Sequence, residues 1–159
     1  IILVLFYMIF NYGRMGLVAD LALIIYTLLV IGSLVAFRAV LTLPGVAGLI
    51  LGIGMAVDAN VIIFERIKDE KRSGKVMGSA LKAGFERAFT TIVDSNVTTL
   101  IVAAVLSYFG TGPVKGFAVT LALSIVISMF TAIIVSRTFL EIWVSKSPDK
   151  FLTKYGVRG

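Results

Sequence analysis

Two aspartates in apolar segments, Asp58 and Asp94, are the residues whose type and setting most clearly suggest chemistry. Each stands two positions before an asparagine, Asn60 or Asn96, inside a stretch that is typical of a membrane-crossing helix. A charge at bilayer depth costs a few kcal/mol on the most lenient scales, so it is seldom retained without a role. The repeated pattern therefore predicts a proton or ion pathway to which these four side chains contribute.

Each aspartate also has a purely structural interpretation. A protonated Asp58 that is hydrogen-bonded to a neighbouring helix needs no transport role. Asp94 stands five residues into its expected span, at a depth of ~7 Å, where a carboxylate can orient the start of the helix. The chain has no histidine, so carboxylates are the only plausible proton carriers that it offers.

The elements that must position these residues follow from hydropathy. Hydrophobic residues make up 58% of the chain, and the mean hydropathy is +1.02, well above the range of soluble domains. Apolar runs of ~20 residues, the length that crosses a bilayer, recur along the chain. The sequence therefore predicts an all-α, polytopic transmembrane helix bundle over residues 1–137, with about five spans at residues 1–10, 17–37, 44–64, 89–109 and 113–135.

The first span and the end of the chain are expected to differ from the rest. Residues 1–10 would cover only ~15 Å as a helix, so we expect them to be the end of a span that begins upstream. Residues 138–159 are polar and basic, and Pro148 discourages a continuous helix there. This segment is expected to be a cytoplasmic tail.

The basic residues predict the orientation. Thirteen of the fifteen fall on the side that holds residue 14, the loop 65–88 and the C-terminus, and the other side receives only Arg38 and Lys115. Lys and Arg accumulate in cytoplasmic loops, so the loop and the C-terminus are expected to be cytoplasmic. This distribution also accounts for the net charge of +6 without nucleic acid as a partner.

Within the loop 65–88, apolar and small residues recur at helical spacing. They predict a short amphipathic helix on the inner membrane surface. Two interpretations stay open, a solvated connector and a docking site for a cytoplasmic partner. The residues concerned are Met77, Leu81, Gly84, Phe85 and Ala88.

Four glycines of the third span are expected to serve helix packing. Gly45, Gly48 and Gly52 form a small-residue stripe that lets helix backbones approach closely. Gly54 lies with Asp58 on a different strip of the same helix. A helix with features on two faces is expected to have neighbours on several sides, so that Asp58 avoids lipid in the centre of the bundle.

Other classes of function find no support in the residues. Cysteine and histidine are absent, so neither a disulfide framework nor the usual metal ligands are present, and no Walker A loop or nucleophile elbow occurs. The sequence thus predicts a transport component rather than an enzyme, with no cofactor and no metal. No Lys or Arg falls in the middle of a span, so a counter-charge for the carboxylates is expected from another subunit or from residues outside this chain.

Several strings resemble the SecD/SecF family of bacterial protein-export translocase subunits, over roughly residues 42–137. The string from Leu43 to Lys68 contains the specific sequence Asp-Ala-Asn-Val-Ile-Ile-Phe-Glu-Arg and is similar to the family's fourth transmembrane segment. Residues 91–99 resemble the start of the fifth segment, and residues 110–130 the loop and the sixth. Ser95 departs from the alanine that the family commonly has between Asp and Asn.

The resemblance implies half of a resistance–nodulation–division-type membrane domain in the bacterial cytoplasmic (inner) membrane. It implies a SecF partner, separate or fused, which works with the SecYEG channel, the SecA ATPase and the translocating polypeptide. The family's transmembrane aspartate maps onto Asp58, which on this basis takes part in proton conduction with charged residues of SecF. Residues 1–10 then correspond to the end of the second helix.

Two other functions are compatible with the sequence. One is a proton-coupled exporter of small molecules or lipids in the same superfamily, and the upstream sequence would discriminate it. The other is a scaffold that only holds translocase subunits together. In that case neutralising Asp58 would leave proton-dependent export unchanged.

Overall fold

The computed structural model describes residues 2–38 and 42–146, and among them it is helical with no strand. The predicted all-α bundle is confirmed. Four helices are long and apolar enough to cross a membrane, and a shorter apolar helix precedes them. The elements are α1 (Ile2–Tyr12), α2 (Arg14–Ala36), α3 (Leu43–Arg72), α4 (Met77–Phe109), α5 (Pro113–Phe130), the π-helical segment η1 (Thr131–Ser136) and α6 (Arg137–Lys146).

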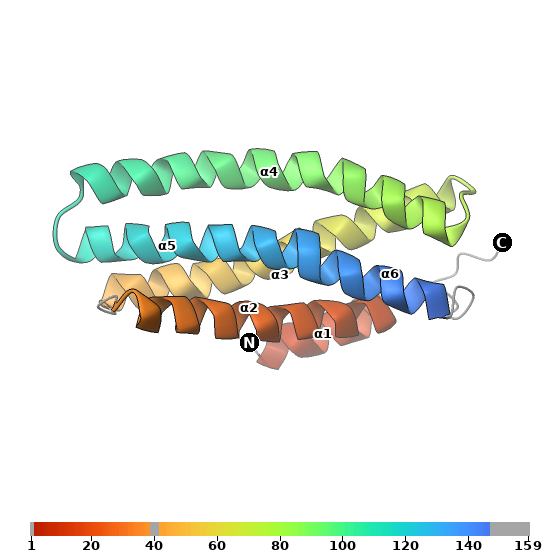
Figure 1. Cartoon of the computed structure of the whole chain (residues 1–159), viewed down its shortest axis with the longest axis horizontal. Coiled ribbons are helices and arrows are strands. Elements are labelled where there is room, and N and C mark those ends of the chain that lie inside the picture. The colour runs from red at the N-terminus through yellow and green to blue at the C-terminus, as the bar shows by residue number, and fades with distance from the viewer. Residues whose placement is uncertain (1, 39–41, 147–159) are drawn as a thin grey trace.

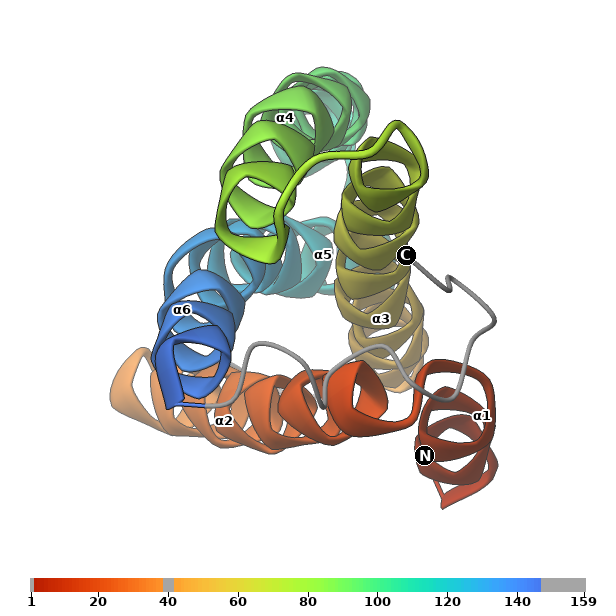
Figure 2. The same cartoon turned by 90° about the vertical axis from the view of Figure 1, so that its right-hand side faces the viewer.

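The long helices lie side by side along one axis and alternate in direction (Figure 1). Viewed along that axis, α3 stands between α4 and α2, with α5 and α6 beside it and α1 at the outside (Figure 2). The most extensive packing joins α3 to α5 and to α4. Asp58 and Asn60 therefore lie on the helix that holds the bundle together.

The helix ends follow from local chemistry. Thr42 caps α3, because its hydroxyl accepts a hydrogen bond from the Gly45 amide at 3.2 Å, and Pro44 occupies the first turn. Gly13, with φ of 54°, separates α1 from α2. That left-handed conformation is cheap only for glycine, and it lets the chain reverse direction with one residue between the helices.

The segment 65–88 differs from the expected loop. α3 continues from Phe64 to Arg72, and α4 already begins at Met77, so the connection is a short turn. The predicted amphipathic stretch is the first part of α4, and its apolar side chains are buried in one cluster with Phe64 and Ile67 of α3. It therefore packs on α3 instead of forming a separate surface helix.

Close packing and ion pairs hold this helical hairpin together. A methyl group at Gly84 would lie 2.8 Å from the backbone of Ile67, so the two helices nearly touch there. The buried carboxylate of Glu70 contacts Lys75 Nζ at 2.5 Å and Arg87 Nη1 at 2.7 Å. Sequence hydropathy ended the span at Phe64 because charges begin there, but Glu, Lys and Arg have high helix propensity, so the helix continues beyond the apolar run.

The last helix is also longer than expected. α5, η1 and α6 form one continuous helical path from Pro113 to Lys146, whereas the sequence placed the end of the span near Val135. α6 is stabilised by Leu140 and Val144, whose side chains are buried against the bundle. The predicted tail beyond residue 146 lies outside the described residues.

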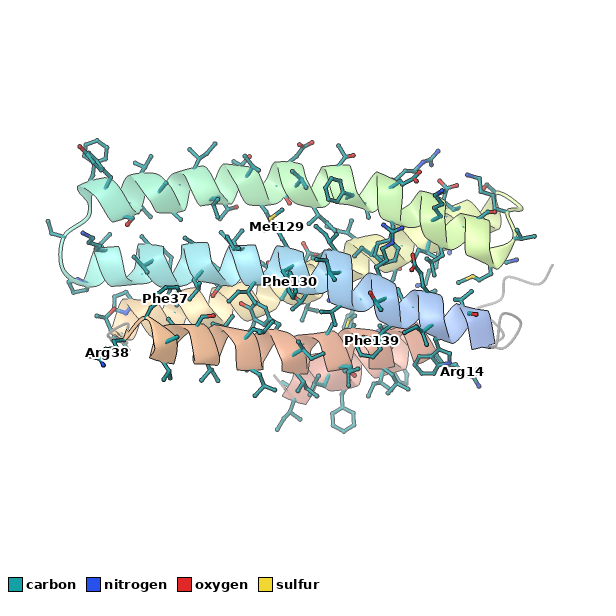
Figure 3. All side chains as sticks on the ribbon, viewed as in Figure 1. Arg14, Phe37, Arg38, Met129, Phe130 and Phe139 are labelled. Carbon is teal, nitrogen blue, oxygen red and sulfur yellow. The ribbon has the colours of Figure 1, made fainter. Side chains whose placement is uncertain are left out.

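The two ends of the bundle differ in charge. Figure 3 places Arg14 at the end where α6 finishes and Arg38 at the opposite end. The turn between α3 and α4 lies at the Arg14 end, and the start of α5, which carries Lys115, lies at the Arg38 end (Figure 1). Among the described residues, the basic side chains therefore gather mainly at the Arg14 end of the bundle.

Candidate functional site

The inner side of α3 is lined by three of the four glycines and faces α5. A methyl group at Gly48 would lie 3.2 Å from the Phe117 carbonyl oxygen, and one at Gly52 would lie 2.5 Å from Ser124 Cβ. Gly45 faces the same helix near Thr120. The absence of side chains on this side allows the α3 and α5 backbones to approach closely.

The outer side of α3 carries Gly54 and Asp58, and both are exposed. Nothing lies within 4 Å of a methyl group placed at Gly54. The structure differs here from the expectation that Asp58 is enclosed within the bundle. The physical reason is that α4 and α5 cover other sides of α3, and α1 is too short to cover this strip in the described part of the chain.

A small crevice separates Asp58 from α4. Its volume is about 200 Å³, and polar and apolar side chains line it in similar measure. Asn96 is buried in its wall and donates from Nδ2 to the Ile92 carbonyl at 2.7 Å, which leaves its Oδ1 available as an acceptor. Asp58 and Asn96 are thus brought together, and the lining residues are Met55, Asp58, Ala59, Ile62, Ile92, Ser95, Asn96 and Thr99.

A second crevice lies on the α1 side of Asp58. It is wider, about 450 Å³, open and mainly apolar, with Tyr7 as its other polar group. Gly54 also lines it. Asp58 therefore stands on a ridge between a half-polar crevice and an apolar one, accessible from outside this chain.

Asp94 is not part of this arrangement. Its side chain is exposed and lines neither crevice. Because α4 begins at Met77, Asp94 lies about five turns into its helix, and not near the helix start as the hydropathy-based span suggested. Its neighbours Ser95 and Asn96 share a crevice with Asp58, so the two aspartates lie at similar levels of the bundle but face different directions.

Asn60 points the other way from Asp58, into the bundle. Its Oδ1 accepts a hydrogen bond from the Ser136 hydroxyl at 2.5 Å, and its Nδ2 donates to the Ala56 carbonyl at 3.0 Å. The two Asp-x-Asn motifs therefore differ. In the first motif, Asn60 points away from the crevice that Asp58 lines. In the second motif, Asn96 lines that same crevice, and Asp94 does not.

The sequence-based prediction gave no role to Ser136, which directly follows the expected span at residues 113–135. A signal was present in the spacing of the small and polar stripe along α5. Gly116, Thr120, Ser124 and Ser128 recur every fourth residue, whereas the step from Thr131 to Ser136 is five residues. A π-helical turn produces that wider spacing on one face.

A third carboxylate, Asp20, is sheltered within the chain. It is 8% exposed, and its Oδ1 has no hydrogen-bond partner among the described residues. The same residues contain no group of three or more metal-ligating side chains.

Comparison with known proteins shows the family to which this helix bundle belongs. The family described as "Protein export membrane protein SecD/SecF, C-terminal" matches residues 1–146. The chain belongs to the SecD/SecF family. Its resemblance to that family, which the motifs around Asp58 and Asp94 predicted, is thereby confirmed.

Curated SecD/SecF relatives are similar along nearly the whole chain. The protein translocase subunit SecD of Acidaminococcus fermentans is 54% identical over 98% of this chain. That of Rickettsia prowazekii is 53% identical over 92% of it. The chain spans only 37% and 28% of the length of these two relatives.

Solved structures of the family share the fold. The crystal structure of SecDF from Thermus thermophilus, described as a translocon-associated membrane protein, matches with a TM-score of 0.89 and 43% identity. The match covers 92% of this chain and 21% of that one. A crystal structure of SecDF in a super-membrane-facing form matches equally well, with a TM-score of 0.89. The chain is therefore part of a membrane protein with a SecDF-like helix arrangement.

Proposed function

We propose that this chain is the C-terminal membrane portion of a protein-export subunit that uses the proton motive force to assist polypeptide translocation across the bacterial cytoplasmic membrane. The observation that carries the proposal is the family match over residues 1–146, with relatives named protein translocase subunit SecD at more than 50% identity. Its partners are SecF, the SecYEG channel, SecA and the translocating polypeptide. The helical hairpin at residues 65–88 and the C-terminus face the cytoplasm in this proposal, as the basic residues predict.

Asp58 is the proton-carrying residue of this proposal. An exposed carboxylate on a membrane-crossing helix would cost a few kcal/mol against acyl chains, which favours a protein surface over it. Asp58 is exposed between two crevices, and it takes part in none of the salt bridges found among the described residues. A SecF helix packed on this ridge would supply the missing counter-charge and exclude lipid.

The remaining polar residues have subordinate roles. Asn96 lines the crevice beside Asp58 with a free carbonyl oxygen, so it is suited to orient a water or a protonated carboxyl there. Asn60 orients α3 from the opposite side, and Asp94 is a weaker candidate because it faces away. Each proton that moves through 100 mV supplies ~2.3 kcal/mol, so mechanical work on a polypeptide requires several.

The decisive variant is Asp58→Asn in the full-length subunit with its SecF partner. We expect normal assembly with SecF but loss of the gradient-stimulated part of export in inverted membrane vesicles, because an amide does not carry a proton. Asp69→Asn is the matched control, since Asp69 is exposed on the same helix and its contact with Arg72 is a surface ion pair at 3.5 Å. Full gradient-stimulated export by Asp58→Asn would refute proton conduction through this residue and favour the scaffold.

A further inference from the structure

One hydrogen bond joins the helix of Asp58 to the π-helical segment. The Ser136 hydroxyl donates to Asn60 Oδ1 at 2.5 Å, across 76 residues of sequence. Ser136 is 0% exposed and Asn60 is 3% exposed, so water does not compete for either partner. Because Asn60 Nδ2 also donates to its own helix at Ala56, the carboxamide is held from both ends.

Asn60 and Asp58 lie on opposite sides of one helix. Residues two positions apart in an α-helix, such as 58 and 60, are separated by about 200° around the helix axis. The contacts agree, because Asp58 lines the outer crevices and Asn60 is buried. An α-helix is stiff over so short a distance. Any shift of α3 that follows from a change at Asp58 therefore also displaces the Asn60 carboxamide.

Ser136 is the last residue of η1, and this segment is the irregular part of an otherwise regular helix. A π-helical turn holds one more residue than an α-helical turn would, and such turns are frequent at functional sites. Thr131 stabilises its beginning, because its hydroxyl contacts the Ile127 carbonyl at 3.0 Å and the Ser128 carbonyl at 3.1 Å. Conversion of the turn to α-helix would rotate α6 by about 100° relative to α5.

Such a rotation would have a detectable consequence. α6 buries Leu140 and Val144 against the bundle in the π-helical arrangement. A change of register by one residue would remove both side chains from these positions. The amide protons of η1 and α6 consequently report on the state of the π-helical turn.

We propose that Ser136 is a positioning residue that ties α3 to the π-helical turn, and that this turn accommodates the shift of α3 when Asp58 changes its charge or its partner. Asp58's role in this scheme rests on the proposed function. The Ser136–Asn60 contact and the π-helical turn do not. The segment η1–α6 is thus a second path, beside α3 itself, through which the state of Asp58 reaches the end of the bundle that carries the charged hairpin.

The test is hydrogen exchange of the amides in residues 131–146, in the full-length subunit bound to SecF. We expect Asp58→Asn to change their exchange rates by about threefold or more in the parent protein. In a Ser136→Ala background the same substitution should change them by less than half as much. Ser128→Ala is the matched control, because Ser128 is equally buried on the same helical path but donates only to its own helix, at Ile125.

The double variant Asn60→Leu/Ser136→Ala separates positioning from stability. Ser136→Ala alone leaves the buried Asn60 Oδ1 without its donor, and this can destabilise the protein. The double variant removes the donor and the acceptor together, so neither is left unpaired and the fold is preserved. We expect it to restore thermal stability without restoring the response of residues 131–146 to Asp58→Asn. The proposal is overturned if the response is equal in the Ser136→Ala and Ser128→Ala backgrounds, if the double variant regains it, or if the parent shows none.

These readouts are independent of export. Loss of the exchange response with intact sensitivity of export to Asp58→Asn would overturn the positioning role alone. A persistent exchange response with gradient-stimulated export unaffected by Asp58→Asn would instead overturn proton conduction and leave the positioning role supported.

Discussion

The two sides of α3 differ in what they contact. The inner side, with Gly45, Gly48 and Gly52, packs closely on α5, and an added methyl group would be tightly placed at Gly48 and would collide at Gly52. The outer side, with Gly54 and Asp58, has open space around it. Glycine therefore has two different structural roles along this helix. On one side it allows close packing within the chain, and on the other side it leaves the helix surface open.

The comparison also concerns polar groups. Asn60, on the inner side, has both ends of its carboxamide paired within the chain, whereas Asp58, on the outer side, lines two crevices. A group that is satisfied internally contributes to the fold, and a group that is left accessible is available to a partner. α3 thus combines a side that packs within the chain and a side that stays accessible, where the proposed function places the partner and the proton-carrying residue.

The largest expected effect comes from filling the inner side. Gly52→Leu should lower the free energy of unfolding by about 3 kcal/mol, because its side chain would overlap Ser124 and the Tyr26 hydroxyl. Gly54→Leu should change it little, since space is open there. The midpoint of thermal unfolding in detergent measures both, and equal losses in the two variants would contradict the distinction between the sides.

An intermediate effect is expected for assembly. Gly54→Leu should reduce the amount of SecF that co-purifies with the full-length subunit by about tenfold, which corresponds to ~1.4 kcal/mol, because the new side chain stands where the partner helix is proposed to pack. Val46→Leu, on an exposed position nearer the start of α3, is the control. Unchanged SecF recovery with Gly54→Leu would place the partner elsewhere.

The smallest effect separates the two asparagines. Asn60→Leu leaves the buried Ser136 hydroxyl without its acceptor, so it should cost about 1 kcal/mol of stability. Asn96→Leu removes only a bond to the carbonyl of its own helix and should cost about 0.5 kcal/mol or less. Chemical denaturation of the two variants measures the difference, and a larger loss for Asn96→Leu would reverse the proposed assignment.

Much of the fold could be predicted from the sequence, because long apolar runs and their charged margins have few alternatives to membrane helices. The family was recognisable from the string around Asp58. The stripe of glycines was visible at helical spacing, but which helix it would face was not, because spacing defines a face and not its neighbour.

The remainder depended on tertiary contacts. Hydropathy ended the third span at Phe64, yet pairing of Glu70 with Lys75 and Arg87 and the contact of Gly84 with Ile67 extend the helices beyond it. The link from Asn60 to Ser136 joins residues far apart in sequence, so no local pattern reveals it. The exposure of Asp58 depends on which helices pack beside α3, and a local sequence pattern does not reveal its neighbours.

The unbroken length of α3 has a mechanical consequence. From Asp58 to its last residue, Arg72, the helix continues for ~21 Å without a hinge, and its charged tip is clamped to the neighbouring helix. A tilt of α3 at Asp58 is therefore carried along the helix to its charged end. A molecule that binds the charged end of α3 would therefore respond to a movement of the helix that begins at Asp58.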